Sequence, residues 1–347
     1  MIDLDSPQEF LDRRMRSVDR RRLLVPRDPQ QVVDFSVRLY HKLAWPILRL
    51  TIPSMILLYA GLIFFQGFVI PGLMSTSHPN DIKIQFSEVM VVYGVALFVA
   101  LPVVVIALSY TVGLTTRLAS SYILEQRIDL DEGIAAARKG AQTMVGLLLH
   151  VFLRAGIILM LAGSLFMVSA YFNQSGYSDG MADLAGSFAF LGMISGFIAA
   201  PLVMSRMSLA PAAATIENLG AREAMSRSAL LLKKARHIPS GYETLLKIWG
   251  ISLLVGLILW GGFQASFAMA GVSAFVNEYA NVSIGSALLA ETLRTLPSFA
   301  ALWIVTPFVA CGCTVTYFDR RVRLEALDIE TMAHDVLQGT ETADLRL

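Results

Sequence analysis

The chain has 347 residues, 55% of them hydrophobic and 16% charged, and its mean hydropathy is +0.60. Soluble domains carry a charge on about a quarter of their residues, so this composition excludes an ordinary soluble protein and indicates an integral membrane protein. The net charge of +1 leaves no overall positive field that would attract nucleic acid.

Residues 1–47 are predicted to form a basic amphipathic leader in the cytoplasm. Ser6 and Glu9 fit the ends of a capping box, with a proline at the first helical position. Apolar side chains then share one face, and arginines cover the rest, among them Arg20, Arg21 and Arg22. Such a helix either lies on an anionic leaflet or is a solvated segment that sets the topology. A second start at Asp28 predicts a short interfacial helix that ends at Tyr40, ahead of a proline.

Six membrane spans are predicted from length and apolarity. They lie near residues 50–72, 87–113, 144–170, 184–207, 245–268 and 294–316. Most Lys and Arg residues lie before the first span, after the sixth, and in the loops that follow the second and fourth. The other three connections contain Lys83 as their one basic residue. The positive-inside rule therefore predicts a multi-pass protein of the cytoplasmic membrane, with both termini and both basic loops in the cytoplasm.

The same pattern recurs three times along the chain: a pair of spans, a proline in the second span, and then a charged helix. These charged helices are predicted near residues 129–142, 221–237 and 320–336, and together they would form a cytoplasmic collar. The predicted fold class is thus an all-α integral membrane protein with six transmembrane helices, arranged as three hairpins that are each followed by an amphipathic helix. The transmembrane domain would cover residues 48–335, and residues 337–347 would be a flexible tail.

Several charged residues are candidates for contacts with lipids or partner proteins. His150 and Arg154 lie four residues apart on one face of the third predicted span, where ionisable groups are costly. In the cytoplasmic part of a span, these side chains can also extend toward the lipid headgroups as anchors. Further candidates lie in the leader and the collar: Arg20, Arg21, Arg22, Lys233, Lys234, Arg236, Arg320, Arg321 and Arg323. Glu88, Glu291 and Arg294 could form an outer polar cluster, although interfacial charges are also satisfied by water.

The sequence contains no familiar catalytic or metal-binding pattern. HExxH, P-loop and GxSxG motifs are missing, and five scattered histidines do not predict a metal site, so no cofactor is expected. Cys311 and Cys313 are two residues apart in an apolar run, and on a helix they would point in nearly opposite directions. They are therefore predicted to be reduced packing residues rather than a disulfide.

Tyr317 to Glu330 reads YFDRRVRLEALDIE, with an aromatic pair, a basic RxR and an acidic end. The middle unit contributes Pro211, Glu217, the pair Glu223-Ala224 and the pair Arg227-Ser228. These residues resemble a family of bacterial polytopic proteins similar to the membrane domain of glycerophosphodiester phosphodiesterases. The resemblance covers most of residues 40–335. It implies a six-helix membrane domain without the soluble catalytic barrel, and it transfers no catalytic residues.

The predicted function is that of a non-enzymatic membrane scaffold or assembly subunit. It would bind partner proteins, a second copy of itself, or anionic headgroups of the cytoplasmic leaflet through the collar, and no nucleic acid. The alternative is a transporter or lipid-translocating channel that uses the interior of the bundle, since prolines in the even-numbered spans could free backbone carbonyls.

Overall fold

The computed structural model describes residues 26–64, 101–124, 134–135, 138, 140–154, 187, 190–191, 194, 203–233, 241–272 and 284–325. All regular secondary structure in these residues is helical. The main helices are α2 (Pro29–Phe64), α5 (Leu101–Ile123), α8 (Ala210–Ile216), α9 (Ala221–Leu232), α10 (Gly241–Met269) and α12 (Ile284–Glu325). Residues 140–154 and 203–207 are also helical. The predicted all-α fold class is confirmed for this part of the chain.

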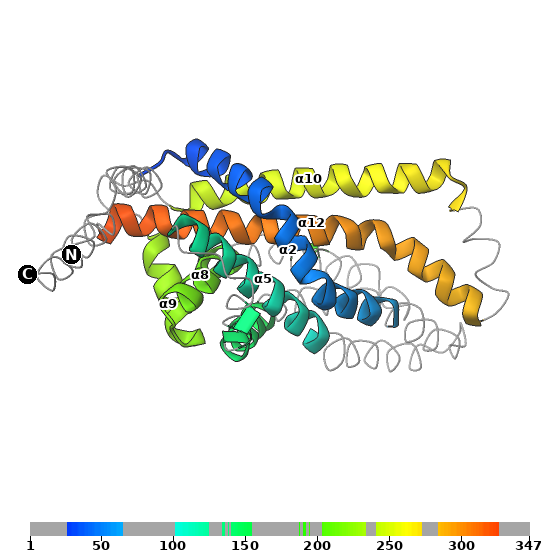
Figure 1. The fold of residues 1–347 in the computed structure, drawn as a ribbon, viewed down its shortest axis with the longest axis horizontal. Coiled ribbons are helices and arrows are strands. Elements are labelled where there is room, and N and C mark those ends of the chain that lie inside the picture. The colour runs from blue at the N-terminus through cyan, green and yellow to red at the C-terminus, as the bar shows by residue number, and fades with distance from the viewer. Residues whose placement is uncertain are drawn as a thin grey trace, which may run out of the picture.

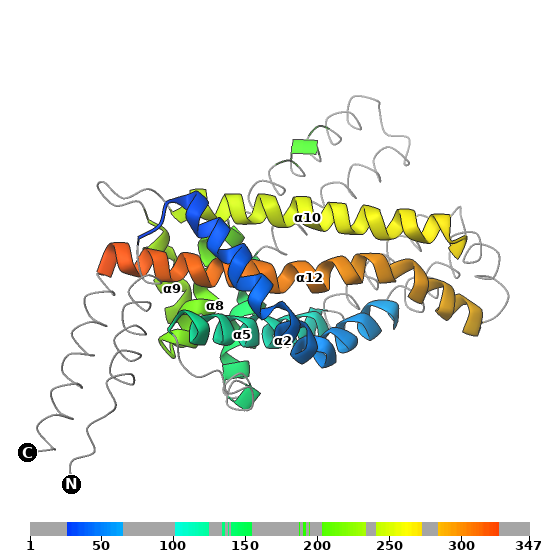
Figure 2. The same ribbon diagram turned by 45° about the horizontal axis from the view of Figure 1, so that its top comes forward.

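Helix α12 is the longest described helix and lies at the centre of the arrangement (Figure 1). Helix α10 runs beside it, α2 crosses it, and α5 packs against both α2 and α12 (Figures 1 and 2). The short helices α8 and α9 form a hairpin beside the C-terminal end of α12. Asn218 makes the turn between them with φ at 53°, a left-handed conformation that asparagine tolerates better than most residues.

Four of the described helices are long and apolar enough to cross a membrane. These segments are Pro29–Gly61, Pro102–Ile123, Gly241–Met269 and Thr292–Glu325. The last two cover most of the fifth and sixth predicted spans, whereas the first two overlap the first and second predicted spans only in part. Most of the third and fourth predicted spans, near 144–170 and 184–207, lies outside the described residues. Gly192 and Gly196, whose GxxxG spacing in the fourth predicted span would permit close helix packing, also lie outside the described residues.

Helix α2 corrects the prediction of two separate elements near the N-terminus. A helix ending at Tyr40 and a span beginning near residue 50 were expected, but one helix runs from Pro29 to Phe64 with Pro46 and Pro53 inside it. The predicted boundary between residues 47 and 48 therefore falls within a continuous helix. Proline removes a hydrogen bond and bends a helix without always ending it, and α2 changes direction along its length (Figure 1).

Helix α12 is likewise continuous where two elements were expected. The predicted collar helix near 320–336 begins, in its described part, as an unbroken extension of the last span to Glu325. The collar helix near 221–237 is α9, which ends at Leu232. Its predicted start is confirmed, because the backbone N–H of Gly220 donates to the carboxylate of Glu223 at 3.4 Å. The collar helix near 129–142 lies largely outside the described residues.

The core is concentrated where α2, α5, α8, α9 and α12 meet. Fully buried side chains there include Leu39, Leu114, Leu209, Leu231 and Tyr317. Farther along α12, Phe299 packs with Met55 and Leu58 of α2 in a second, smaller core. The cysteines behave as predicted, since Cys311 and Cys313 are both buried and unbonded. The largest core therefore lies at the end of the molecule that also holds the charged residues described next.

Candidate functional site

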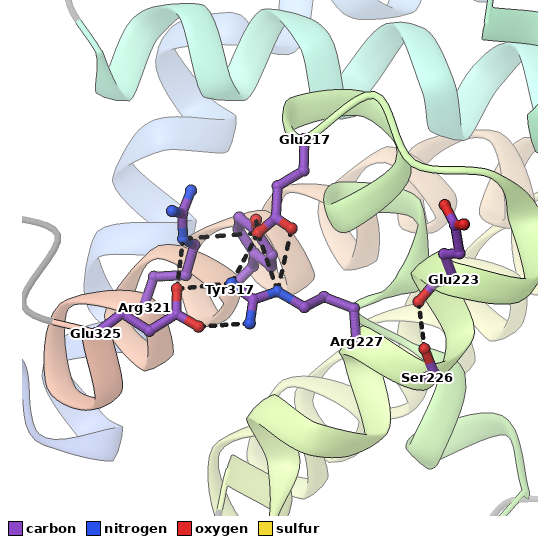
Figure 3. Close-up of polar contacts among 7 residues, drawn as sticks. All are labelled: Glu217, Glu223, Ser226, Arg227, Tyr317, Arg321 and Glu325. Atoms are coloured by element: carbon purple, nitrogen blue, oxygen red, sulfur yellow. Dashed lines mark hydrogen bonds and ion pairs between the residues drawn. The ribbon is translucent and has the colours of Figure 1, made fainter.

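The charged residues at the C-terminal end of α12 meet the α8–α9 hairpin in one compact group. We call Glu217, Arg227, Tyr317, Arg321 and Glu325 the ion-pair cluster (Figure 3). Glu217 directly follows α8 and Arg227 lies in α9, whereas the other three residues lie on α12 at spacings of four. Because residues four apart share one face of a helix, α12 presents all three toward the hairpin.

Arg227 connects the two carboxylates of the ion-pair cluster. Its Nε donates to both carboxylate oxygens of Glu217 at 3.1 Å, and its Nη2 donates to Glu325 Oε2 at 2.6 Å. Its Nη1 lies 2.5 Å from the other oxygen of Glu325. Both carboxylates therefore receive more than one donor, which is the strong, directional form of the arginine–carboxylate pair.

Arg321 and Tyr317 complete the cluster from α12. Arg321 Nε lies 3.0 Å from Glu325 Oε2 and 3.6 Å from Glu217 Oε1. The Tyr317 hydroxyl donates to Glu217, and the Arg321 guanidinium lies 5.9 Å from the centre of the Tyr317 ring. The tyrosine side chain is fully buried, so its hydroxyl needs an acceptor, and Glu217 supplies one.

Burial and charge act in opposite directions on Arg227. Burial disfavours its charged form, but hydrogen bonds and charge from Glu325 and Glu217 outweigh this and raise the pKa of Arg227. The cluster contains two guanidinium groups and two carboxylates, so its formal charge is balanced. Its carboxylates are occupied by fixed donors. The arrangement is thus suited to holding helices in position rather than to transferring protons.

Arg320 has a different role from its neighbour Arg321. It is 2% exposed, and its Nε and Nη2 donate to the carbonyls of Leu231 and Lys233 at 2.8 and 3.2 Å. The last carbonyls of a helix lack partners within that helix, so an arginine from α12 caps α9. Gly241 allows this packing at the start of α10, because a Cβ atom there would lie 2.8 Å from Leu232 Cδ2 and 3.3 Å from Arg320 Cδ.

Asp319 joins the segment before α2 to the end of α12. It accepts the backbone N–H of Arg27 at 2.8 Å and the Nε of Arg323 at 3.0 Å. The guanidinium of Arg27 lies 4.1 Å from the centre of the Phe35 ring. Burial lowers the pKa of Arg27, and the charge of Asp319 partly offsets this effect. Asp319, Arg320 and Arg321 are consecutive on α12. They bind, in that order, the segment before α2, the end of α9 and the residue that follows α8.

An apolar cavity of about 330 Å³ lies along α12, beginning one turn before the ion-pair cluster. Its walls come from α5, residues 147–152, residues 204–212, Trp249 of α10 and the stretch of α12 from Leu302 to Thr314. Cys313 lines it, whereas Cys311 does not. The cavity opens to the outside rather than being sealed, and nearly all of its lining is apolar.

The structure places the predicted contact residues in different environments. Arg320 is not available to lipids or partners, because it is buried against α9. Arg321 and Arg323 are largely buried and form ion pairs within the chain. His150, Arg154 and Lys233 are exposed, and the imidazole of His150 is hydrogen-bonded to the carbonyl of Gly146 in its own helix. Arg20, Arg21, Arg22, Lys234 and Arg236 lie outside the described residues.

The predicted outer polar cluster is described for one of its members only. Arg294 is exposed, whereas Glu88 and the side chain of Glu291 lie outside what the structure describes. The ion-pair cluster, in contrast, was not predicted. Its residues were noted separately in the two charged stretches, and the signal that could have joined them was the need to pair acidic and basic groups beside an apolar core.

The fold and the site together define a helical membrane protein in which a charge-balanced cluster fixes a helical hairpin to the end of a long apolar helix. The chain matches no family model, no curated protein and no solved structure with which it was compared.

Proposed function

We propose that the chain is a multi-pass protein of the bacterial inner membrane that acts as a non-enzymatic scaffold or assembly subunit. Six spans would place both termini and the collar in the cytoplasm, where α9 would face partner proteins or anionic headgroups. The observation that carries this proposal is the attachment of α9. The ion-pair cluster holds its middle and Arg320 holds its C-terminal end, so its outward face has a fixed orientation.

The two faces of α9 differ as a docking helix requires. Its inward face contains Ala224, Met225, Ser228, Leu231 and Leu232, all of them buried. Ser228 accepts the backbone N–H of Leu209 at 3.2 Å and donates to the carbonyl of Arg206 at 2.8 Å, which ties α9 to the segment before α8. This face is fully used within the chain.

The outward face of α9 carries a stripe formed by Arg222, Glu223, Ser226, Leu230 and, at the C-cap, Lys233, all exposed. Their spacing of three and four residues places them on one side of the helix. Leu230 is 61% exposed although its neighbour Leu231 is fully buried. An exposed leucine with Arg222 and Lys233 to either side and Glu223 on the same face, on a rigidly held helix, suits a partner that offers an apolar pocket with acidic groups in its rim.

Photocrosslinking from the outward stripe tests the proposal. A photoreactive amino acid at position 230, in the full chain within its own membrane, should give one adduct of defined mass. Reversing the charge of the stripe with Arg222→Glu and Lys233→Glu should abolish that adduct. The matched control is the same photoreactive residue at Leu254 of α10, which is 59% exposed and should react with lipid chains. If position 230 gave no defined protein or headgroup adduct, or if the charge reversal left it unchanged, the scaffold proposal would be wrong.

The resemblance to the membrane domain of glycerophosphodiester phosphodiesterases remains a proposal that rests on the quoted residues. It is compatible with a scaffold role, because that domain is implied to lack catalytic residues of its own. Among the described residues, three members of the ion-pair cluster come from the YFDRRVRLE stretch and two from the middle unit. The residues that carry the resemblance thus include those that hold α9 in place.

A second candidate function is transport or lipid translocation, and the apolar cavity is the observation that favours it. Its test is solute or lipid flux in vesicles containing the purified protein. Flux that is lost when the cavity is filled by a larger side chain would support this candidate. Flux equal to that of protein-free vesicles would exclude it.

A further inference from the structure

Three of the hydroxyl groups in the lining of the apolar cavity donate to carbonyls within their own helical segments. Thr306 and Thr314 donate to the carbonyls of Leu302 and Ala310 at 2.8 Å, and Ser208 donates to the carbonyl of Ser205 at 2.7 Å. The indole nitrogen of Trp249 is buried and forms no hydrogen bond with the described part of the chain. Because nearly all of the lining is apolar, the cavity is suited to hydrocarbon more than to a polar solute.

The size and position of the cavity agree with a lipid chain. A methylene group and a water molecule occupy similar volumes, about 30 Å³, so about 330 Å³ admits a chain segment of roughly ten carbons. Three of its walls, α5, α10 and α12, are helices apolar enough to cross a membrane. Its opening is therefore expected to face acyl chains rather than water.

An exposed cation lies one turn beyond the lining residues on a helix that forms one wall of the cavity. Leu147 and Val151 line the cavity, and Arg154 follows them at the spacing that keeps all three on one helix face. Arg154 is exposed, and among the described residues no ion pair is found for it. A guanidinium beside an apolar chain site is complementary to a phosphate attached to that chain.

We propose that the cavity binds one acyl chain of an anionic phospholipid from the surrounding bilayer, and that Arg154 binds the phosphate of the same lipid. The proposal depends on the membrane location of the chain and not on the scaffold role of α9. The lipid would fill the gap between α5, α10 and α12 in place of protein side chains. One phospholipid would thus be a structural part of the folded protein.

The test uses the full-length protein, purified in detergent, stripped of lipid and titrated with phosphatidylglycerol or phosphatidylcholine. Native mass spectrometry counts the lipids that remain bound. The wild-type protein should retain one phosphatidylglycerol at low concentration and bind phosphatidylcholine more weakly. Arg154→Gln should weaken phosphatidylglycerol binding about fivefold, since one cation near an anionic headgroup contributes on that scale. It should leave phosphatidylcholine binding unchanged.

Filling the cavity tests the chain site separately from the phosphate site. Val309→Phe on α12 and Val112→Phe on α5 each place a phenyl ring in the cavity and should abolish tight binding of both lipids. Val255→Phe on the exposed face of α10 is the matched control and should bind as the wild type does. Folding of each variant is checked by its helical circular dichroism. If both cavity variants folded and kept the lipid, or if the wild type retained none, the proposal would be overturned.

Fluorescence gives an answer even if neither cavity variant folds. The chain has four tryptophans, and replacing Trp45, Trp260 and Trp303 by phenylalanine leaves Trp249 at the cavity wall. A phospholipid with brominated acyl chains should quench Trp249 saturably, at about one lipid per protein. Quenching that rose only in proportion to the lipid added would show bulk contact alone and would contradict the proposal. The scaffold proposal would survive that result, because it concerns α9.

Discussion

Helices α10 and α12 lie side by side (Figure 2), and the most apolar 18-residue stretch of each has the same mean hydropathy of 1.8. The two stretches are nevertheless packed very differently. In α12, 61% of this stretch is buried inside the protein, whereas in α10 only 17% is buried. Helix α12 contacts α2, α5, α8, α9 and α10, whereas α10 packs mainly on α12. Apolarity alone therefore predicts that a helix can cross a membrane, but not whether protein or lipid surrounds it.

The side chains of the two helices explain this difference. The most buried stretch of α12 is rich in small residues from Ala310 to Thr316, and small residues let neighbouring backbones approach closely. Helix α10 has large exposed side chains instead, such as Leu253, Leu257 and Ile258. In a bilayer such side chains lose nothing by facing lipid, so stability should depend on α12 far more than on α10.

The largest expected effect is at Tyr317. Tyr317→Ala leaves a cavity in the main core and removes a hydrogen bond to Glu217, so the free energy of unfolding should fall by about 3–5 kcal/mol. Tyr317→Phe, which removes the hydroxyl alone, should cost about 1 kcal/mol. Leu253→Ala on α10, at 65% exposed, should cost much less than Tyr317→Ala. Unfolding in mixed detergent micelles measures all three variants. Equal losses at Tyr317 and Leu253 would contradict the comparison.

The ion pairs of the two helices should differ in the same way. Arg227→Met leaves Glu217 and Glu325 with Arg321 as their shared cation and should cost about 1.5–3 kcal/mol. Lys247→Met removes an exposed pair with Glu243 at 3.1 Å on α10 and should cost about 0.3–0.5 kcal/mol.

A double-mutant cycle with Glu325→Met separates pairing from packing in the ion-pair cluster. If the cluster acts as a unit, the double variant should lose less than the sum of the two single variants. Additive losses would show that Arg227 and Glu325 do not depend on each other.

The sequence predicted local features of the fold more accurately than long-range ones. The apolar helices, the cap at Gly220 and the buried, unpaired cysteines all follow from periodicity or from spacing along the chain. The continuity of α2 through Pro46 did not follow, because neighbouring helices stabilise a bent helix that proline alone would interrupt.

The ion-pair cluster was not predicted because its members come from two distant stretches. Glu217 and Tyr317 are 100 residues apart, and the sequence shows the charges without showing which of them meet. Arg320 and Arg321 are adjacent arginines in a basic run, and the sequence alone does not distinguish their roles. The face of α12 on which each lies makes one a helix cap and the other a member of the cluster.

The sharpest test compares two glycines, one on each helix, because the two effects should have opposite signs. At Gly312 of α12, an added Cβ atom would lie 2.8 Å from Ile248 Cγ2, so Gly312→Ala should force the helices apart and cost about 1–2 kcal/mol. At Gly261 of α10, an added Cβ atom meets nothing within 4 Å, so Gly261→Ala should stabilise the helix by about 0.5–1 kcal/mol. The unfolding midpoints of the two variants should therefore move in opposite directions. A shift of the same sign in both would mean that close packing against α12 does not control the position of α10.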